Sequence, residues 1–255
     1  MNAATTSALP LAFEIDRRHP RAPQVYRTLR EAILDLRLKP GTPISENRIC
    51  ELAEVSRTPV REAIIRLAQE ELISVFPQEG SFVAPIRLRK VVEASFVREA
   101  LEASLLKVAI AVWTPADTEA TEDILRLQRK YAAAADHLAF FREDENFHFK
   151  FANVAGLEGV SSIINDAATH LARIRRLANP VSGHMDRAIA EHQLVLECVR
   201  DGAIAEGVAT LTKHLSRVFK TLTQLSQSYP EYFEDRGGRQ EAIPEAMRRY
   251  LARQA

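Results

Sequence analysis

From Leu88 to Ser228 the chain shows only the apolar spacing of helices, interrupted by short turns. Apolar residues recur every three or four positions, which places them on one face of a helix. Turn residues interrupt this spacing at 114–115, 156–159, 179–183 and 201–202. Six helices joined by turns this short run antiparallel, so we expect a helical bundle. The predicted helices are 88–113, 116–135, 137–155, 159–178, 185–200 and 203–228.

The N-terminal third shows a different pattern of residues. Apolar spacing predicts helices over 24–38, 45–53 and 57–71, and Ser45 and Ser56 open the second and third. β-Branched and aromatic residues lie on both sides of Pro77–Gly80, which predicts a β-hairpin over 72–86. Three short helices followed by a hairpin outline a winged helix-turn-helix, so the predicted fold class is mainly α.

These patterns divide the chain into four segments. Residues 1–21 are rich in Ala, Thr and Pro without a period, which predicts a disordered tail. The winged helix occupies 22–86 and the bundle 87–229. Residues 230–255 form a polar C-terminal tail punctuated by glycine, with one short helix expected over 244–253.

Composition excludes several classes of protein. The 255 residues carry 34 Lys and Arg against 34 Asp and Glu, so any DNA binding must come from local placement of arginine. The two cysteines lie far apart, which argues against a disulfide framework or a cysteine-based zinc site. The N-terminus is not that of a signal peptide, and no apolar run is long enough for a membrane span. We therefore expect a cytoplasmic protein.

The third predicted helix carries two arginines one turn apart at its start, Arg57 and Arg61. A helix fits the major groove of DNA, where an arginine can form two hydrogen bonds with guanine. The hydroxyls of Ser45, Ser56 and Thr58 are candidates for phosphate contacts. The simpler alternative is that both arginines only pair with neighbouring glutamates on a surface helix.

Four polar residues fall on or beside the apolar faces of bundle helices. Asp144 and His148 lie one turn apart on 137–155, His192 lies on the stripe of 185–200, and His214 borders the stripe of 203–228. A buried carboxylate is costly unless it is paired or bound to metal, and one Asp with three His suits a divalent cation. The alternatives are an ordinary pair between Asp144 and His148 and hydrogen-bonded core histidines.

Other polar residues suggest a ligand beside these four. Arg98 lies at the middle of the apolar stripe of 88–113, where a guanidinium needs an anion. Glu102, one turn on, is the simple partner, and a carboxylate ligand is the alternative. His170 is a candidate to line the same cavity, and Arg173 is a weaker second candidate for the ligand. His184 is expected at the surface.

Both halves of the chain resemble one family. The recognition-helix string resembles the GntR family of bacterial transcription regulators: SRTPVREAIIRLAQEEL (56–72). The bundle resembles the FadR-type effector domain called FCD, and six helices favour its VanR-like form. The strings that carry this second resemblance are VREALE (97–102), DENFH (144–148), EH (191–192) and HL (214–215). The resemblance implies that Asp144, His148, His192 and His214 are metal ligands.

The sequence departs from this family at three places. Asn47 stands where a basic residue is frequent, and Glu54 stands where glycine is usual in the turn before the recognition helix. The wing tip is Gln78–Glu79–Gly80 rather than basic. Since Glu79 repels phosphate, wing contacts should rest on backbone groups near Gly80.

The sequence thus predicts a transcription regulator, a repressor rather than an activator, and not an enzyme. We expect a homodimer on a pseudo-palindromic double-stranded operator. The expected effector is a small carboxylate bound at a divalent metal, with zinc ahead of nickel, manganese and iron. A metal-responsive regulator is the alternative, and a metal-dependent hydrolase is a remote one.

Overall fold

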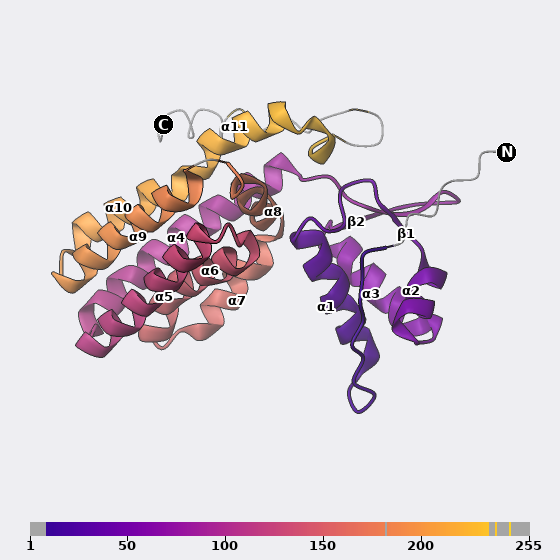
Figure 1. Cartoon of the computed structure of the whole chain (residues 1–255), viewed down its shortest axis with the longest axis horizontal. Helices are drawn as coiled ribbons and strands as arrows, with labels where there is room; N and C mark the ends of the chain where they lie inside the picture. The colour runs from indigo at the N-terminus through magenta and orange to yellow at the C-terminus, as the bar shows by residue number, and fades with distance from the viewer. Residues whose placement is uncertain (1–8, 182, 235–237, 239–244, 246–255) are drawn as a thin grey trace. The chain divides into compact units, whose positions relative to one another are not determined.

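The structure is a computed structural model that describes residues 9–181, 183–234, 238 and 245. Its chain forms two compact units, the first ending at Ile86 and the second running from Arg87 to Phe233. Figure 1 shows a small unit of helices and strands and a larger unit of helices. The mainly α fold class predicted from the sequence is confirmed. None of the described helices is long and apolar enough to cross a membrane.

The first unit has the predicted order of three helices and a hairpin. Its helices are α1 (Arg21–Leu34), α2 (Glu46–Ala53) and α3 (Arg57–Gln69), and its hairpin strands are β2 (Ile73–Phe76) and β3 (Gly80–Val83). A short strand that was not predicted, β1 (Pro43–Ile44), pairs antiparallel with β3 and gives the sheet order β1-β3-β2. Two residues are too few to show an alternating pattern.

The segment before α1 differs from the loose tail predicted for 1–21. Residues 9–20 have no regular helix or strand, but Leu11 is buried, and Leu9, Phe13 and Ile15 pack against the core of the first unit. The four apolar side chains occupy alternate positions, so one side of an extended segment covers the core. This period of two was the sequence signal for the packing.

The second unit is an all-helical bundle with two more breaks than predicted. It contains α4 (Leu88–Val112), α5 (Pro115–Ala133), α6 (His137–Val154), α7 (Glu158–Ala167), α8 (Thr169–Ala178), α9 (His184–Arg200), α10 (Ile204–Ser216) and α11 (Val218–Ser228). α4 packs against α6, α8 and α10, and α5 packs against α6 and α9. Polar side chains from α4, α6, α8, α9 and α10 are brought together in this way.

The predicted helices 159–178 and 203–228 are each divided in two. The divisions lie at Ala168 and Arg217, where backbone N–H groups bond three residues back instead of four: Ala168 to Asn165, and Arg217 to His214. Neither division has a proline or glycine at its centre, so no local residue pattern predicts them.

The C-terminal segment continues past α11 into a short 3-10 helix, η1 (Pro230–Tyr232). Tyr232 and Phe233 are buried, so the start of the predicted tail 230–255 belongs to the folded unit. The helix predicted over 244–253 lies outside the described residues, apart from position 245.

Candidate DNA-reading surface and buried histidine site

The start of α3 presents the predicted DNA-reading residues to solvent. Arg57, Thr58 and Arg61 are exposed. Ser56 precedes the helix, and Ser45 caps α2 by accepting the Arg48 backbone N–H at 3.3 Å. The Arg61 Nε lies 2.9 Å from a carboxylate oxygen of Glu46. An exposed pair of this kind contributes little, so it leaves Arg61 available to DNA.

Two backbone conformations explain the family departures at the turn and the wing. Glu54 ends α2 in the left-handed region, with φ 51°, the conformation for which glycine is favoured. At the wing tip, Gly80 has φ 113°, which side chains rarely tolerate, and Gln78 has φ 66°. The wing turn thus requires glycine at position 80 and presents exposed backbone there.

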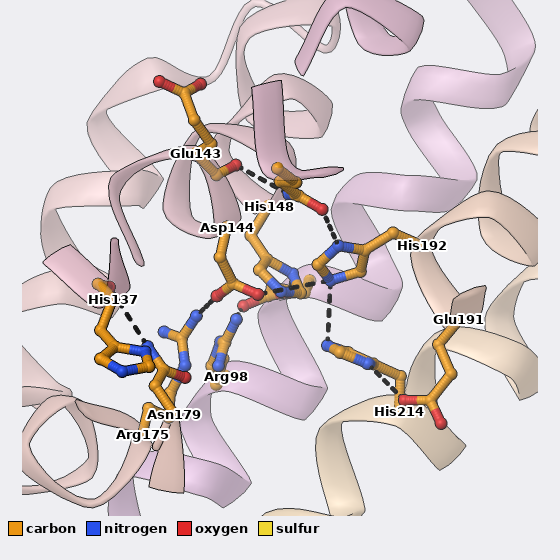
Figure 2. A network of polar contacts seen from close by, with 12 residues as sticks. Arg98, His137, Glu143, Asp144, His148, Arg175, Asn179, Glu191, His192 and His214 are labelled. Atoms are coloured by element: carbon orange, nitrogen blue, oxygen red, sulfur yellow. Dashed lines mark hydrogen bonds and ion pairs between the residues drawn. The ribbon is translucent and has the colours of Figure 1, made fainter. Parts of the chain in front are cut away.

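Three histidines from three helices converge inside the bundle (Figure 2). Ring nitrogens of His148, His192 and His214 all lie within 4.8 Å of one another. The Nε2 atoms of His192 and His214 are 3.2 Å apart. Phe147 stacks on the His192 ring with 4.0 Å between centroids, so an apolar wall borders the cluster. Predicted ligands that are scattered in the sequence therefore meet in space.

Each of these rings is held at Nδ1 by an acceptor. Glu102 lies 2.7 Å from Nδ1 of His148, and Glu191 lies 2.8 Å from Nδ1 of His214. Because carboxylates only accept, both histidines donate there. The Gln128 amide nitrogen donates to the Glu143 carbonyl at 3.0 Å, which turns its oxygen toward Nδ1 of His192, also at 3.0 Å.

These partners leave a lone pair on each Nε2 atom, and those of His192 and His214 lie 3.2 Å apart. Nε2 of His148 is buried and has no hydrogen-bond partner among the described residues. Converging lone pairs repel unless a cation lies between them. Imidazoles whose outer nitrogen is held by a carboxylate or amide oxygen are the usual arrangement for a metal ligand. The donor set therefore fits a divalent metal.

Burial keeps the cluster neutral, as metal binding requires. Burial lowers the pKa of His148 to about 4, with Arg98 acting in the same direction and Glu102 against it. Burial also lowers the pKa of His192 well below its usual value, and His214 shows the same direction. Burial alone would raise the pKa of Glu102, but Arg98 and His148 outweigh it and bring the value to about 2.

Asp144, the fourth predicted ligand, lies between the cluster and an arginine. One of its oxygens is 3.6 Å from Nε2 of His192, and the other pairs with Arg175 on α8. Figure 2 shows the carboxylate pointing between these two groups. Asp144 therefore lies next to His192 but outside the group of three histidines, and Arg175 already neutralises its charge.

Beside the cluster lies a cavity of about 400 Å³. Arg98, Asp144, Arg175 and His214 line it, with residues from α9 and the α10–α11 junction. Arg98 also pairs with Glu102 at 2.5 Å, which is the simple partner expected from the sequence. His184, predicted at the surface, begins α9 and lines the cavity, since the turn before α9 directs it inward.

His170 and Arg173 lie elsewhere in the bundle. His170 accepts the Arg87 backbone N–H at 3.0 Å, at the start of α4. Arg173 is fully buried, and burial lowers its pKa to about 9 while Tyr232 acts against this. Neither residue belongs to the cavity wall. Residues two apart on a helix point to opposite sides, so Arg175 faces the cavity instead of Arg173.

The sequence did not single out Gln128, Glu191 or Arg175. Gln128 had a signal, because Thr121, Leu125 and Gln128 follow helical spacing and all three are buried in α5. Glu191 belongs to the EH string (191–192) that carries the FCD resemblance, but no pattern assigned it a role.

A winged helix with exposed arginines on its third helix, joined to a helical bundle with an internal polar site, defines a DNA-binding regulator of the helix-turn-helix type. Comparison with known proteins agrees. Residues 21–83 match "Bacterial regulatory proteins, gntR family", and residues 93–217 match the FCD domain.

Curated relatives cover most of the chain. A helix-turn-helix transcriptional regulator of Streptomyces ambofaciens is 35% identical over 82% of this chain and 88% of its own. The transcriptional repressor RspR of Escherichia coli K12 is 30% identical over 83% of this chain and 93% of its own. The solved structure of E. coli McbR/YncC has a TM-score of 0.68 at 19% identity, over 83% of this chain and 99% of that one.

The chain therefore belongs to the GntR family of bacterial transcription regulators and carries an FCD domain. The matching domains and relatives are transcription regulators and not enzymes.

Proposed function

We propose that this regulator is a homodimeric, cytoplasmic repressor that responds to a small organic acid bound at a divalent metal in its bundle. The observation that carries the proposal is the clustering of three buried histidine rings whose nitrogens lie within 4.8 Å of one another, each ring held by an acceptor at Nδ1. Such a set is costly to bury without a cation.

His148, His192 and His214 would hold the metal, with Asp144 as the fourth protein ligand once it releases Arg175. Three neutral imidazoles and a carboxylate suit zinc first, and also nickel, manganese or iron. The bound ion supplies a Lewis acid to which the carboxylate of a ligand can attach. Arg98 and Arg175 line the adjoining cavity and would pair with the same carboxylate.

At the other unit, Arg57 and Arg61 would read bases in the major groove, while Ser45, Ser56, Thr58 and the backbone near Gly80 contact phosphate. A two-fold dimer would place two such helices on a pseudo-palindromic operator. Repression is proposed because the E. coli relative RspR is described as a repressor. The acid would act by binding one arrangement of the bundle more tightly than another.

A metal-responsive regulator is the second candidate, because the histidine cluster can hold a cation whether or not an acid binds. Operator binding by the full chain separates the two, measured by fluorescence anisotropy after chelator treatment, with metal restored, and with metal plus hydroxy acids. A change only when an acid is added supports the proposal. A change on metal alone supports the metal-responsive alternative. Constant operator affinity in all three conditions rules out both.

A further inference from the structure

The cavity beside the histidines has a pronounced excess of positive charge. Two anionic side chains line it, Asp144 and Glu191. Six cationic side chains line it: Arg98, Arg175, Arg187, Lys213, Arg217 and Lys220. A hollow with this balance concentrates anions.

Three of these cations already have a carboxylate partner. Arg98 pairs with Glu102, Arg175 pairs with Asp144, and Arg217 Nε lies 2.5 Å from a Glu191 oxygen. These pairs surround the histidine cluster and are partly or fully shielded from solvent. One acid group that attaches at the metal would enter this inner part of the cavity.

The remaining cations lie at the exposed rim. Arg187 stands in the first turn of α9, Lys213 in the last turn of α10, and Lys220 in the first turn of α11. All three are exposed. Arg187 and Lys213 form no ion pair with another described residue, although both border the cavity. Positive charge from separate helices is therefore concentrated at the outer end of the cavity.

The break between α10 and α11 contributes to this arrangement. Ser216, Arg217 and Val218 at the break are themselves part of the cavity wall. Lys213 before the break and Lys220 after it both line the cavity.

We infer that the effector carries at least two anionic groups, and that Arg187 and Lys213 bind the one that does not attach at the metal. The inference rests on the proposed function and narrows it to small acids with at least two anionic groups. A dicarboxylate and a phosphorylated hydroxy acid share this chemistry. Arginine and lysine at the rim suit either group, since both bind carboxylate and phosphate.

Matched acids test the inference by calorimetry on the zinc-loaded full chain. Malate and 2-hydroxybutyrate share the hydroxy-acid end and differ by one carboxylate. 3-Phosphoglycerate and glycerate differ by one phosphate. In at least one pair, we expect the acid with two anionic groups to bind about tenfold or more tightly than the acid with one, equivalent to about 1.4 kcal/mol. The pair that shows the preference identifies the second group.

Two double variants assign the preference to the rim. Arg187→Gln with Lys213→Gln should reduce the preference to roughly threefold or less, because the affinity for malate or 3-phosphoglycerate should fall more than that for the matched acid with one anionic group. The control, Lys107→Gln with Lys130→Gln, removes the same charge from exposed positions outside the cavity wall. It should preserve the preference for the acid with two anionic groups.

The outcomes separate the inference from the function on which it rests. Equal affinity within both pairs overturns the inference and leaves an acid-responsive regulator standing. A preference that survives in the rim variant overturns the assignment to Arg187 and Lys213. Failure of all four acids to bind overturns the proposed acid response itself, and the inference with it.

Discussion

The winged-helix unit and the helical bundle bury very different side chains. Fourteen polar or charged residues are buried in the described part of the chain, and only Gln24 belongs to the winged helix, which leaves thirteen in the bundle. The winged helix keeps its candidate functional groups on the surface over an apolar core. The bundle places its candidate functional groups in its interior.

This difference has an energetic consequence. Burying a polar group costs free energy unless a partner satisfies it, and the partners of Arg98, His148 and His192 come from within the bundle. Replacing an exposed arginine at the start of α3 should therefore change DNA binding alone. Replacing a buried polar residue in the bundle should change stability as well as function.

Acid pH should separate the two units most strongly. His170 and His184 lie in the bundle, and burial lowers their pKa values below 6.5, well below for His170 and to about 4 for His184. Below pH 6.5 these two histidines bind protons in the unfolded chain but stay neutral in the folded bundle. Their contribution to the stability of the bundle is therefore complete above that pH and decreases as the pH falls. The metal-free bundle should therefore be less stable at pH 5 than at pH 7.5.

Trp113 makes this measurable, because it is the one tryptophan in the chain and contacts Phe151 in the bundle. Urea unfolding followed by its fluorescence at pH 7.5 and pH 5 reports the bundle alone. His184→Asn should reduce the difference between the two pH values. An unfolding midpoint that does not change between them would contradict the pKa directions.

Arg61→Ala should weaken operator binding about 10- to 100-fold, because one arginine paired with guanine contributes about 1–3 kcal/mol. Metal content and bundle stability should not change. Arg66→Ala is the matched control: it removes the same charge from α3, where Arg66 stacks on Tyr26 at 3.8 Å. Operator affinity of the Arg61→Ala variant equal to that of the Arg66→Ala variant would show that α3 does not read DNA through Arg61.

His170→Ala tests whether the buried histidines of the bundle have different tasks. His170 accepts the Arg87 N–H, so its loss leaves that donor unsatisfied and should cost about 1–3 kcal/mol of bundle stability. Metal affinity should remain that of the wild type, since His170 is not among the clustered residues. Loss of metal in this variant would mean that the site extends to α8.

The smallest expected effect concerns the turn before α3. Glu54→Gly should stabilise the winged helix by about 0.5–1 kcal/mol, because glycine adopts the left-handed conformation without strain. Loss of the exposed pair with Arg17 should cost little. Hydrogen exchange over residues 45–72 should slow in this variant while exchange in the bundle stays unchanged. Faster exchange over 45–72 would show that Glu54 contributes more than its backbone strain costs.

Periodic apolar spacing and turn residues were sufficient to predict the order of elements. They indicated α1 to α3, the hairpin and most bundle helices. They failed at Ala168 and Arg217, where the division lies in a change of hydrogen-bond spacing rather than in a breaking residue. The extended packing of residues 9–20 was missed because its composition resembles that of a disordered segment.

The candidate site was predictable only where a polar residue interrupts an apolar stripe. Asp144, His148 and His192 do so, and His214 lies at the edge of one. Glu191 sits on a face whose burial is decided by packing between helices, which no single-helix pattern contains, whereas Gln128 continues the helical spacing of Thr121 and Leu125. Arg175 was missed in favour of Arg173 because rotation about α8, and not composition, decides which arginine faces the cavity.

The most direct test of the central claim is a calorimetric titration of Zn²⁺ into the chelator-stripped full chain. We predict roughly one high-affinity equivalent per chain, with protons released only weakly near neutral pH because the histidines are already neutral. His192→Ala should weaken binding beyond the ~10- to 100-fold loss typical of outer partners, whereas His170→Ala should not. Absence of high-affinity binding by zinc, nickel, manganese or iron, or wild-type affinity in His192→Ala, would contradict the metal site.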